Sequence, residues 1–212
     1  MHDIPCQLYL ISPLETGGDF PNQLRNALAA GPVAAFQFRV KDVNPEQAAE
    51  LAAPLKVICD EFDVAFIVND DIALAKQIGA DGVHLGQSDE NLKNARAELG
   101  LDVQIGITCH DSRHLAMEAG EGGANYVAFG AFFPTKTKET HHKPELDILE
   151  WWSAMMEIPC VAIGGVTPEN CQPLIDAGAD FLAVSGAVWH DSDGAAQAVR
   201  KFAAKLDVGE KS

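Results

Sequence analysis

The sequence predicts an α/β protein with a single-domain (β/α)8 TIM barrel, and three observations support this fold class. Short apolar runs alternate along the chain with segments of helical character, which is typical of right-handed βαβ units and a parallel sheet. There are eight such runs, as many as a closed barrel needs, and several end abruptly in polar side chains. The 212 residues make a compact barrel, since ~250 residues are typical of the fold. An open doubly wound sheet is the structural alternative, but it usually has fewer strands.

Each apolar run is short, which predicts a strand buried on both faces. In chain order, the predicted strands are Leu8–Ser12, Ala34–Arg39, Ala65–Asn69, Gly82–Gly86, Val103–Thr108, Tyr126–Gly130, Cys160–Gly164 and Phe181–Ser185. The helical segments between them include Pro45–Phe62, Asn91–Leu99, Asp111–Ala119, Leu146–Met156 and Pro168–Ala177. We expect one barrel domain over residues 1–212, with a flexible C-terminal tail from about residue 206.

A short repeat precedes three of the predicted strands. Gly79–Val83, Gly123–Val127 and Gly178–Leu182 share the pattern Gly-Ala-Asp/Asn followed by apolar residues. Each repeat falls where a helix is expected to end, and its glycine can adopt the left-handed conformation that closes a helix. The repeat therefore indicates a reused scaffold unit, and function is expected where the opposite ends of the strands differ from one another.

Composition and charge exclude several classes of protein. The formal net charge of −16 disfavours binding to nucleic acid or to an anionic membrane, so an anionic substrate needs local cations, a metal or backbone amides. The five cysteines are scattered, odd in number and free of any C-x-x-C pair, which favours reduced thiols. The N-terminus has no basic start before an apolar stretch, and no apolar run approaches a membrane span. We expect a soluble cytoplasmic protein.

Two neighbouring strands end in carboxylates. Phe66–Asp70 and Gly82–Asp89 are apolar runs that stop in polar residues, including Asp70 and Asp89. Because the carboxyl ends of parallel strands meet at one rim, these two side chains are expected to share a hard cation. Mg²⁺ is the natural ion, since it takes few protein carboxylates and completes its shell with water and phosphate oxygens.

Other strand ends carry groups that suit anions. The second strand presents Gln37, Arg39 and Lys41 at alternating positions, which point the same way if the strand continues that far. The third and fifth strands add Asn69 and Thr108. An alternating strand with a solvated face would give the same pattern as the second strand. A lone histidine in an apolar run, such as His84, is more often a hydrogen-bonded core residue, but its polar neighbours favour a place at the rim.

Two later segments suit phosphate. The loop Phe132–Lys138 carries two hydroxyls and two ammonium groups, although surface loops rich in Lys and Thr are common. The seventh strand ends in Gly164–Thr167 and the eighth in Ser185–Ala187, where glycines let a phosphate approach backbone N–H groups. Together the rim residues predict a pyrophosphate subsite and a simpler phosphate subsite. No pattern for covalent catalysis is evident, so displacement of a pyrophosphate leaving group is the chemistry indicated.

Five stretches, in order, resemble the motifs of the thiamine phosphate synthase family (thiamine-phosphate pyrophosphorylase). They are Gln37–Lys41, Asn69–Asp70, Gly82–Gln87 with Asp89, Pro134–Lys138 and Ile163–Thr167. The resemblance extends from about the second predicted strand to the eighth. It implies a (β/α)8 barrel and a transferase of thiamine biosynthesis, which joins hydroxymethylpyrimidine diphosphate to thiazole phosphate with Mg²⁺. The products would be thiamine phosphate and pyrophosphate.

The resemblance also implies residue roles. The pyrimidine diphosphate would contact Gln37, Arg39, Lys41, Asn69, His84, Thr108 and Lys138, with His84 near the reacting rings. The thiazole phosphate would contact Thr135, Lys136, Thr137, Gly165, Ser185 and Gly186. Asp70 and Asp89 would hold the magnesium ion. The family chemistry is dissociative: pyrophosphate leaves, an aminopyrimidine methyl cation forms, and the thiazole nitrogen captures it, so no general base is assigned.

Some positions depart from the family pattern or fall outside it. Thr108 stands where serine is common, and Phe38 where a smaller aliphatic residue is usual, although alternation points Phe38 away from the site. The pair His141-His142 follows the phosphate loop and is left out of the predicted site. Trp151 and Trp152 are expected to pack a helix or form a subunit contact, so a homo-oligomer is compatible with the sequence.

Three other functions are compatible with parts of the same pattern. A thiazole tautomerase-like isomerase uses the same barrel but characteristically lacks the full pyrophosphate set, whereas Arg39, Lys41, Asp70 and Asp89 are all present here. A catalytically silent, regulatory or ligand-binding paralogue would retain the pockets without turnover. Ribulose-phosphate epimerase-like barrels rank last, because these spacings do not supply their metal-binding His and Asp set.

Overall fold

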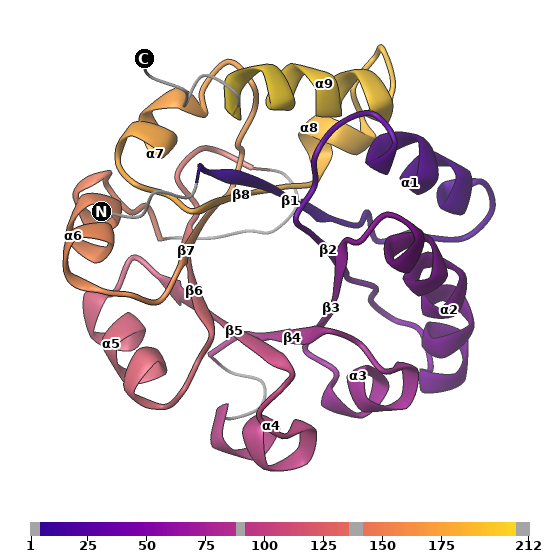
Figure 1. The fold of residues 1–212 in the computed structure, drawn as a ribbon, viewed down its shortest axis with the longest axis horizontal. Helices are drawn as coiled ribbons and strands as arrows, with labels where there is room; N and C mark the ends of the chain where they lie inside the picture. The colour runs from indigo at the N-terminus through magenta and orange to yellow at the C-terminus, as the bar shows by residue number, and fades with distance from the viewer. Residues whose placement is uncertain (1–4, 88–91, 136–141, 207–212) are drawn as a thin grey trace.

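Eight parallel strands close into a barrel in the computed structural model, which describes residues 5–87, 92–135 and 142–206 (Figure 1). The strands follow one another in sequence order around the barrel, and β8 (Phe181–Val184) pairs with β1 (Gln7–Ile11). This closure confirms the predicted fold over the open-sheet alternative. The predicted C-terminal tail falls mainly on residues 207–212, outside the described ranges.

The remaining strands lie close to their predicted bounds. They are β2 (Ala35–Phe38), β3 (Ala65–Asn69), β4 (Gly82–Leu85), β5 (Gln104–His110), β6 (Tyr126–Gly130) and β7 (Cys160–Ile163). The five helices that match predicted segments are α2 (Pro45–Glu61), α4 (Leu92–Leu99), α5 (Arg113–Glu121), α6 (Asp147–Met155) and α7 (Gln172–Asp176). Four others are α1 (Phe20–Leu28), α3 (Ile72–Ile78), α8 (Gly186–Trp189) and α9 (Ala195–Leu206).

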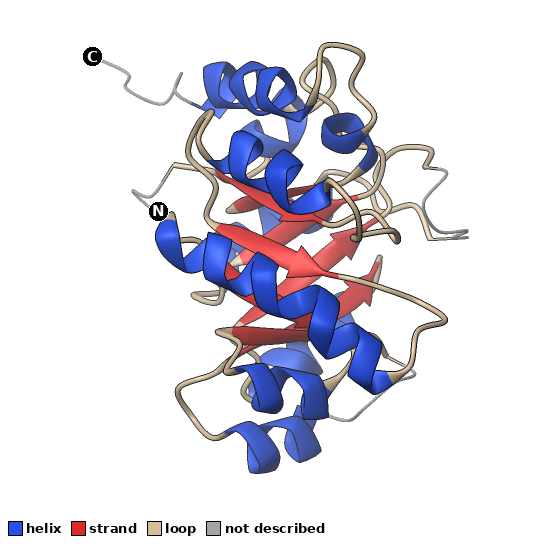
Figure 2. Cartoon of the chain, turned by 90° about the vertical axis from the view of Figure 1, so that its right-hand side faces the viewer, coloured by secondary structure: helices blue, strands red, loops and turns tan. Residues whose placement is uncertain are grey.

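Helices cover the outside of the barrel, and α1 and α9 lie side by side where the ring closes (Figures 1 and 2). Strand alternation sends every second side chain outward to the helices, where Phe36, Phe38 and Phe66 pack in the main core. Phe38 thus points away from the barrel interior, as predicted. Within the described ranges, no helix is both long and apolar enough to cross a bilayer.

The inward-facing side chains form a second, smaller core inside the barrel. It includes Tyr9, Ile67, Tyr126, Val161 and Ala183. Gly106 gives Tyr126 room: a Cβ atom added to Gly106 would lie 1.9 Å from Cζ of Tyr126. The interior is therefore a packed layer, and an open site can lie only beyond it, at the carboxyl ends of the strands.

The three repeats have a common structural role. The glycines Gly79, Gly123 and Gly178 have φ values of 62°, 91° and 94°, as expected for closing the preceding helix. The third residue of each repeat accepts a hydrogen bond from the backbone of the previous strand. The acceptor and donor pairs are Asp81 with Phe66 N (2.7 Å), Asn125 with Ile105 N (2.8 Å) and Asp180 with Cys160 N (2.7 Å). The repeats thus join strand pairs at the amino ends of the strands.

The tryptophan pair is divided between core and surface. Trp152 is buried and donates from Nε1 to the Ile158 carbonyl at 2.7 Å. Trp151 is partly exposed, and the guanidinium of Arg113 lies 4.9 Å from its ring centroid. Helix packing therefore accounts for Trp152.

Candidate functional site at the barrel mouth

The predicted site residues lie in or just after the last part of the strands, at the end of the barrel that we call the mouth. Those that the structure describes are Gln37, Arg39, Lys41, Asn69, Asp70, His84, Thr108, Thr135, Gly165, Ser185 and Gly186. Asp89, Lys136, Thr137 and Lys138 lie outside the described residues, as does His141. The parallel register brings these residues to one end of the barrel, where Gln37 and His84 lie buried within their strands and the others lie at or beyond the strand ends.

Arg39 is anchored by its backbone while part of its side chain is buried. Its N–H donates to Oγ of Ser12 at 2.9 Å, and that hydroxyl donates to the Arg39 carbonyl at 3.0 Å. The guanidinium nitrogen Nη1 is buried, and it has no hydrogen-bond partner within the described residues. A buried donor without a partner is unfavourable, so this nitrogen is suited to an anionic ligand.

Lys41 lies beyond the strand that precedes it. β2 ends at Phe38, so the strand does not continue far enough to make Gln37, Arg39 and Lys41 point the same way by alternation. Lys41 is exposed on the loop before α2. Lys41 and Asn69 nevertheless line the same cavity of about 120 Å³. Phe38, Val68 and Leu74 of the main core line it too, so this cavity lies between the ends of β2 and β3 and the helices α2 and α3.

Asp70 has a left-handed backbone, with φ at 65°, which is uncommon outside glycine but tolerated by Asp and Asn. Its N–H donates to the His84 carbonyl at 2.8 Å, and its Oδ2 accepts from Nδ2 of Asn69 at 2.6 Å. The next residue, Asp71, differs in role: it caps α3 by accepting from Leu74 N at 2.8 Å. Two adjacent aspartates are thus divided between the mouth and helix capping.

The donor chemistry around Asp70 fits a hard cation. Carboxylate and amide oxygens from Asp70 and Asn69 are the kind of ligand that Mg²⁺ takes, with water and phosphate completing its shell. The second predicted ligand, Asp89, lies outside the described residues. Within the described part of the chain, no group of three or more His, Cys, Asp or Glu side chains forms a metal cage.

Five inward-facing residues form a continuous hydrogen-bonded chain below the mouth. Nε2 of Gln37 lies 2.9 Å from the Tyr9 hydroxyl, which lies 2.9 Å from the Tyr126 hydroxyl. The Tyr126 hydroxyl lies 3.0 Å from Nδ1 of His84, whose Nε2 lies 2.8 Å from Oγ1 of Thr108. His84 is only 7% exposed, so it is a hydrogen-bonded interior residue whose Thr108 contact reaches the rim.

The two tyrosines were missed in the sequence as functional candidates. They are the only tyrosines of the chain, and each lies at an inward position of a predicted strand. Burial raises the pKa of Tyr9 to about 12, against the lowering effect of its hydrogen bonds with Tyr126 and Gln37. Burial also raises the pKa of Tyr126 well above its ordinary value. Both hydroxyls therefore stay neutral near pH 7.

The phosphate side of the mouth lies at the ends of β7 and β8. Gly165 has φ at 63°, and an added Cβ would lie 2.4 Å from the Pro134 carbonyl, so a larger residue would force apart two loops. Nδ2 of Asn170 donates to the Gly165 carbonyl at 2.9 Å. Ser185 and Gly186 begin the short helix α8. The glycine contacts hold the loop containing Thr135 next to the end of β7.

A histidine pair lies beside the mouth. The rings of His110 and His142 stack with centroids 4.3 Å apart, and Nδ1 of His142 lies 2.8 Å from Oδ1 of Asp111. These contacts join the end of β5 to the chain that leads into α6.

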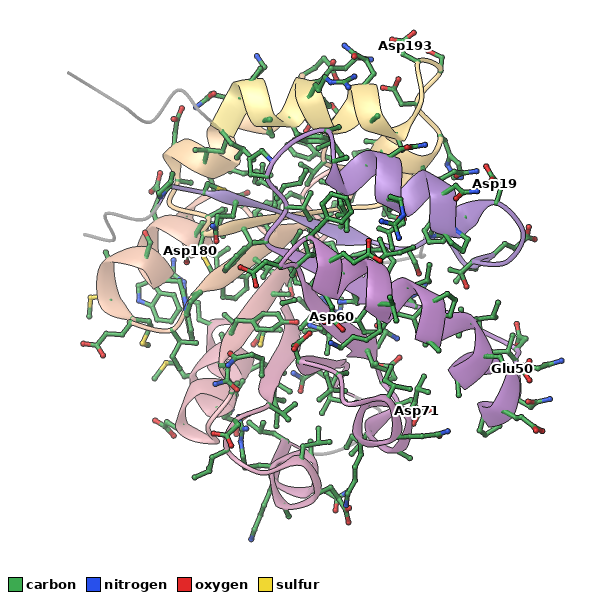
Figure 3. The ribbon with its side chains drawn as sticks, turned by 45° about the vertical axis from the view of Figure 1, so that its right-hand side comes forward. Asp19, Glu50, Asp60, Asp71, Asp180 and Asp193 are labelled. Atoms are coloured by element: carbon green, nitrogen blue, oxygen red, sulfur yellow. The ribbon has the colours of Figure 1, made fainter. Side chains whose placement is uncertain are left out.

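Acidic residues populate the outside of the barrel. Figure 3 shows Glu50 and Asp60 on α2, Asp19 at the start of α1 and Asp193 before α9, and all four are exposed. Arg39, in contrast, lies at the mouth. The distribution of charge agrees with the expectation that an anion must find local cations on a chain of net charge −16.

Comparisons with known proteins agree with this geometry. Residues 8–188 match the family model described as thiamine monophosphate synthase. The thiamine-phosphate synthase of Erythrobacter litoralis is 62% identical over 208 residues, covering 96% of this chain and 97% of the relative. That of Rhodospirillum centenum is 52% identical over 198 residues, covering 93% and 96%. A solved thiamine phosphate pyrophosphorylase from Pyrococcus furiosus has a TM-score of 0.85 at 29% identity and covers 97% of both chains.

Proposed function

The chain belongs to the thiamine monophosphate synthase family, and we propose that it condenses hydroxymethylpyrimidine diphosphate with thiazole phosphate to give thiamine phosphate and pyrophosphate. The observation that carries the proposal is the buried Nη1 of Arg39, which has no partner within the described ranges. A buried guanidinium donor directly after β2, with Lys41 two residues further on and Asn69 at the end of the neighbouring β3, suits a multiply charged anion.

The chain's residues act mainly by stabilising charge on the leaving group. Arg39, Lys41 and Asn69 bind diphosphate oxygens, and Thr108 adds a hydroxyl at the same rim. As the carbon–oxygen bond breaks, negative charge grows on the departing pyrophosphate, and fixed donors stabilise that charge more than the starting ester. Pyrophosphate leaves first, and the thiazole nitrogen then captures the aminopyrimidine methyl cation. No side chain has to remove a proton before the bond breaks.

Asp70 is the described residue that would hold magnesium, with Asp89 as the second proposed ligand. When bound, Mg²⁺ neutralises charge on the diphosphate and makes it a better leaving group. Asn69 orients the Asp70 carboxylate through the 2.6 Å hydrogen bond.

The second substrate is proposed to bind at the ends of β7 and β8. Gly165, Ser185 and Gly186 would receive the thiazole phosphate, with Thr135 and the proposed contacts Lys136 and Thr137 from the neighbouring loop. Barrels often hold a phosphate at these two strand ends, because backbone N–H groups are accessible there. The two anions would thus lie on different sides of the mouth, with their reactive groups between them.

Adjacent aspartates provide a matched test of the magnesium proposal. We expect Asp70→Asn to lower the rate of thiamine phosphate synthesis about 100-fold at limiting Mg²⁺, since a charged ligand is lost at the leaving group. Asn also tolerates the left-handed backbone at this position. Asp71→Asn should stay near the wild-type rate, because Asn caps helices as well as Asp does.

The measurement is turnover as a function of Mg²⁺ concentration for both variants, with unfolding monitored in parallel. Near-normal turnover of Asp70→Asn at limiting Mg²⁺ would exclude Asp70 as a ligand. An equal loss in both variants would mean that general charge, and not coordination, explains the effect.

A further inference from the structure

The hydrogen-bonded chain inside the barrel joins five strands. It runs from Gln37 on β2 through Tyr9 on β1, Tyr126 on β6 and His84 on β4 to Thr108 on β5, with every donor–acceptor distance between 2.8 and 3.0 Å. Tyr9, Gln37, Tyr126 and His84 are each less than 9% exposed. Water therefore has little access to these groups, and the hydrogen bonds between them constrain where their hydrogens lie.

The nitrogen of Gln37 fixes the direction of the hydrogen-bonded chain, that is, which group donates at each bond. Nε2 of Gln37 can only donate, so the Tyr9 oxygen accepts from it. If the Tyr9 hydrogen goes to Tyr126, then the Tyr126 hydrogen goes to Nδ1 of His84, and each hydroxyl has an acceptor. In the opposite order, Tyr9 would accept from both neighbours, and its own hydrogen would have no acceptor among the hydrogen bonds of the chain.

The same order determines the histidine tautomer. A neutral imidazole that accepts at Nδ1 carries its hydrogen on Nε2. That hydrogen is then donated to Oγ1 of Thr108, 2.8 Å away. With its oxygen already accepting from His84, the Thr108 hydroxyl has its hydrogen left to donate to another group.

We propose that Gln37, Tyr9 and Tyr126 are positioning residues that hold His84 as the Nε2–H tautomer and so commit the Thr108 hydroxyl to donate to an anionic substrate oxygen at the mouth. The identity of that oxygen as part of the diphosphate rests on the proposed function. A hydroxyl is both donor and acceptor, so without this commitment its lone pairs could face the anion. Fixing the hydrogen in advance removes the need to reorient it during the reaction.

The first test is the tautomer of His84 in the ligand-free, full-length protein. Nitrogen-15 NMR distinguishes a protonated ring nitrogen from an unprotonated one, and a His84→Gln variant assigns the signal among the seven histidines. We expect Nδ1 to be unprotonated and Nε2 protonated. A hydrogen on Nδ1 would overturn the inference, whether or not the protein makes thiamine phosphate.

The second test reverses the direction of donation along the hydrogen-bonded chain. Gln37→Glu, measured at a pH well above the pKa of a carboxyl group, replaces the donor with an acceptor and should move the hydrogen of His84 to Nδ1. In a Tyr9→Phe background, the same change should leave the tautomer unaltered because the chain is interrupted. An unaltered tautomer in Gln37→Glu alone, or a shift that survives Tyr9→Phe, would contradict control through the chain.

A double-mutant cycle links the tautomer to catalysis. Tyr126→Phe and Thr108→Val should each lower kcat/KM about tenfold, and the double variant little further, because both remove the same committed donor. Thr108→Ser keeps the hydroxyl and should lose less of kcat/KM than Thr108→Val. Additive losses would assign Tyr126 a packing role only. If Tyr126→Phe does not fold, Tyr9→Phe replaces it in the cycle. Absence of all turnover with the expected wild-type tautomer would contradict the proposed function and leave the tautomer assignment intact.

Discussion

Arg39 combines a fixed backbone with a buried nitrogen that has no partner within the described residues. An unsatisfied buried donor costs about 1–3 kcal/mol of stability. Such a cost is commonly retained at sites where a ligand later supplies the missing partner. The residue is therefore better explained by binding than by folding.

Replacing Arg39 with methionine should separate these two effects. We expect Arg39→Met to unfold at the same or a higher temperature without ligand, and to lose most of the stabilisation by pyrophosphate with Mg²⁺. Thermal unfolding with and without these ligands measures both. Arg25→Met is the control, since Arg25 pairs with Glu61 on the exposed outer surface and should not affect the ligand-induced shift. A full shift in Arg39→Met would remove this residue from the site.

The repeated Gly-Ala-Asp/Asn segments explain how elements far apart in sequence are joined. In each one a glycine with positive φ lies at or just after the end of a helix, and two residues later a side chain accepts a hydrogen bond from the first or second residue of the preceding strand. The repeats lie at the end opposite the mouth, where barrels carry residues that stabilise the fold. The residues at the mouth ends of the strands are therefore free to differ from one strand to the next.

Asp180 allows this role to be tested. Asp180→Ala leaves the N–H of Cys160 without its 2.7 Å partner and should lower the free energy of unfolding by about 1–3 kcal/mol. Asp180→Asn should cost much less, because Asn125 makes the equivalent bond with its amide oxygen. Urea unfolding compares the two. Equal losses would mean that the negative charge of Asp180, rather than its acceptor oxygen, is what stabilises the barrel.

On the scale of the whole molecule, the barrel was predictable because each apolar run alternates with a helix in chain order. The rim residues followed from strand ends, since every parallel strand ends at the same side. The hydrogen-bonded pair Tyr9 and Tyr126 could not be predicted from the sequence, because a tyrosine in a strand is usually a packing residue. Their 2.9 Å contact also joins positions 117 residues apart. The position of Lys41 on a loop could not be predicted, because the alternation of side chains does not reveal that β2 ends at Phe38.

Buried acidic groups give the whole protein a predictable response to alkali. Tyr9 has its pKa raised from 10.0 to about 12, chiefly by burial, and burial likewise raises the pKa of Cys59 and Cys109 from 9.0 to about 12. Because the folded pKa is the higher one, each contribution to stability is fully present below the unfolded pKa and is lost as the pH rises through the folded value. Each unit of difference corresponds to about 1.4 kcal/mol.

We therefore expect the free energy of unfolding to fall from about pH 9 and most steeply between about pH 10 and 12. Since both tyrosines are buried, phenolate absorbance should rise together with the loss of circular dichroism. Phenolate that forms near pH 10 in the folded protein would show that the interior chain is open to water.

The central claim is that the mouth of this barrel joins two phosphorylated substrates. The most direct measurement incubates the purified protein with hydroxymethylpyrimidine diphosphate, thiazole phosphate and Mg²⁺, and quantifies both products by mass spectrometry and a pyrophosphate assay. We predict thiamine phosphate and pyrophosphate in equal amounts, and no thiamine phosphate when either substrate or Mg²⁺ is omitted. Absence of both products under conditions where a known synthase turns over would contradict the claim.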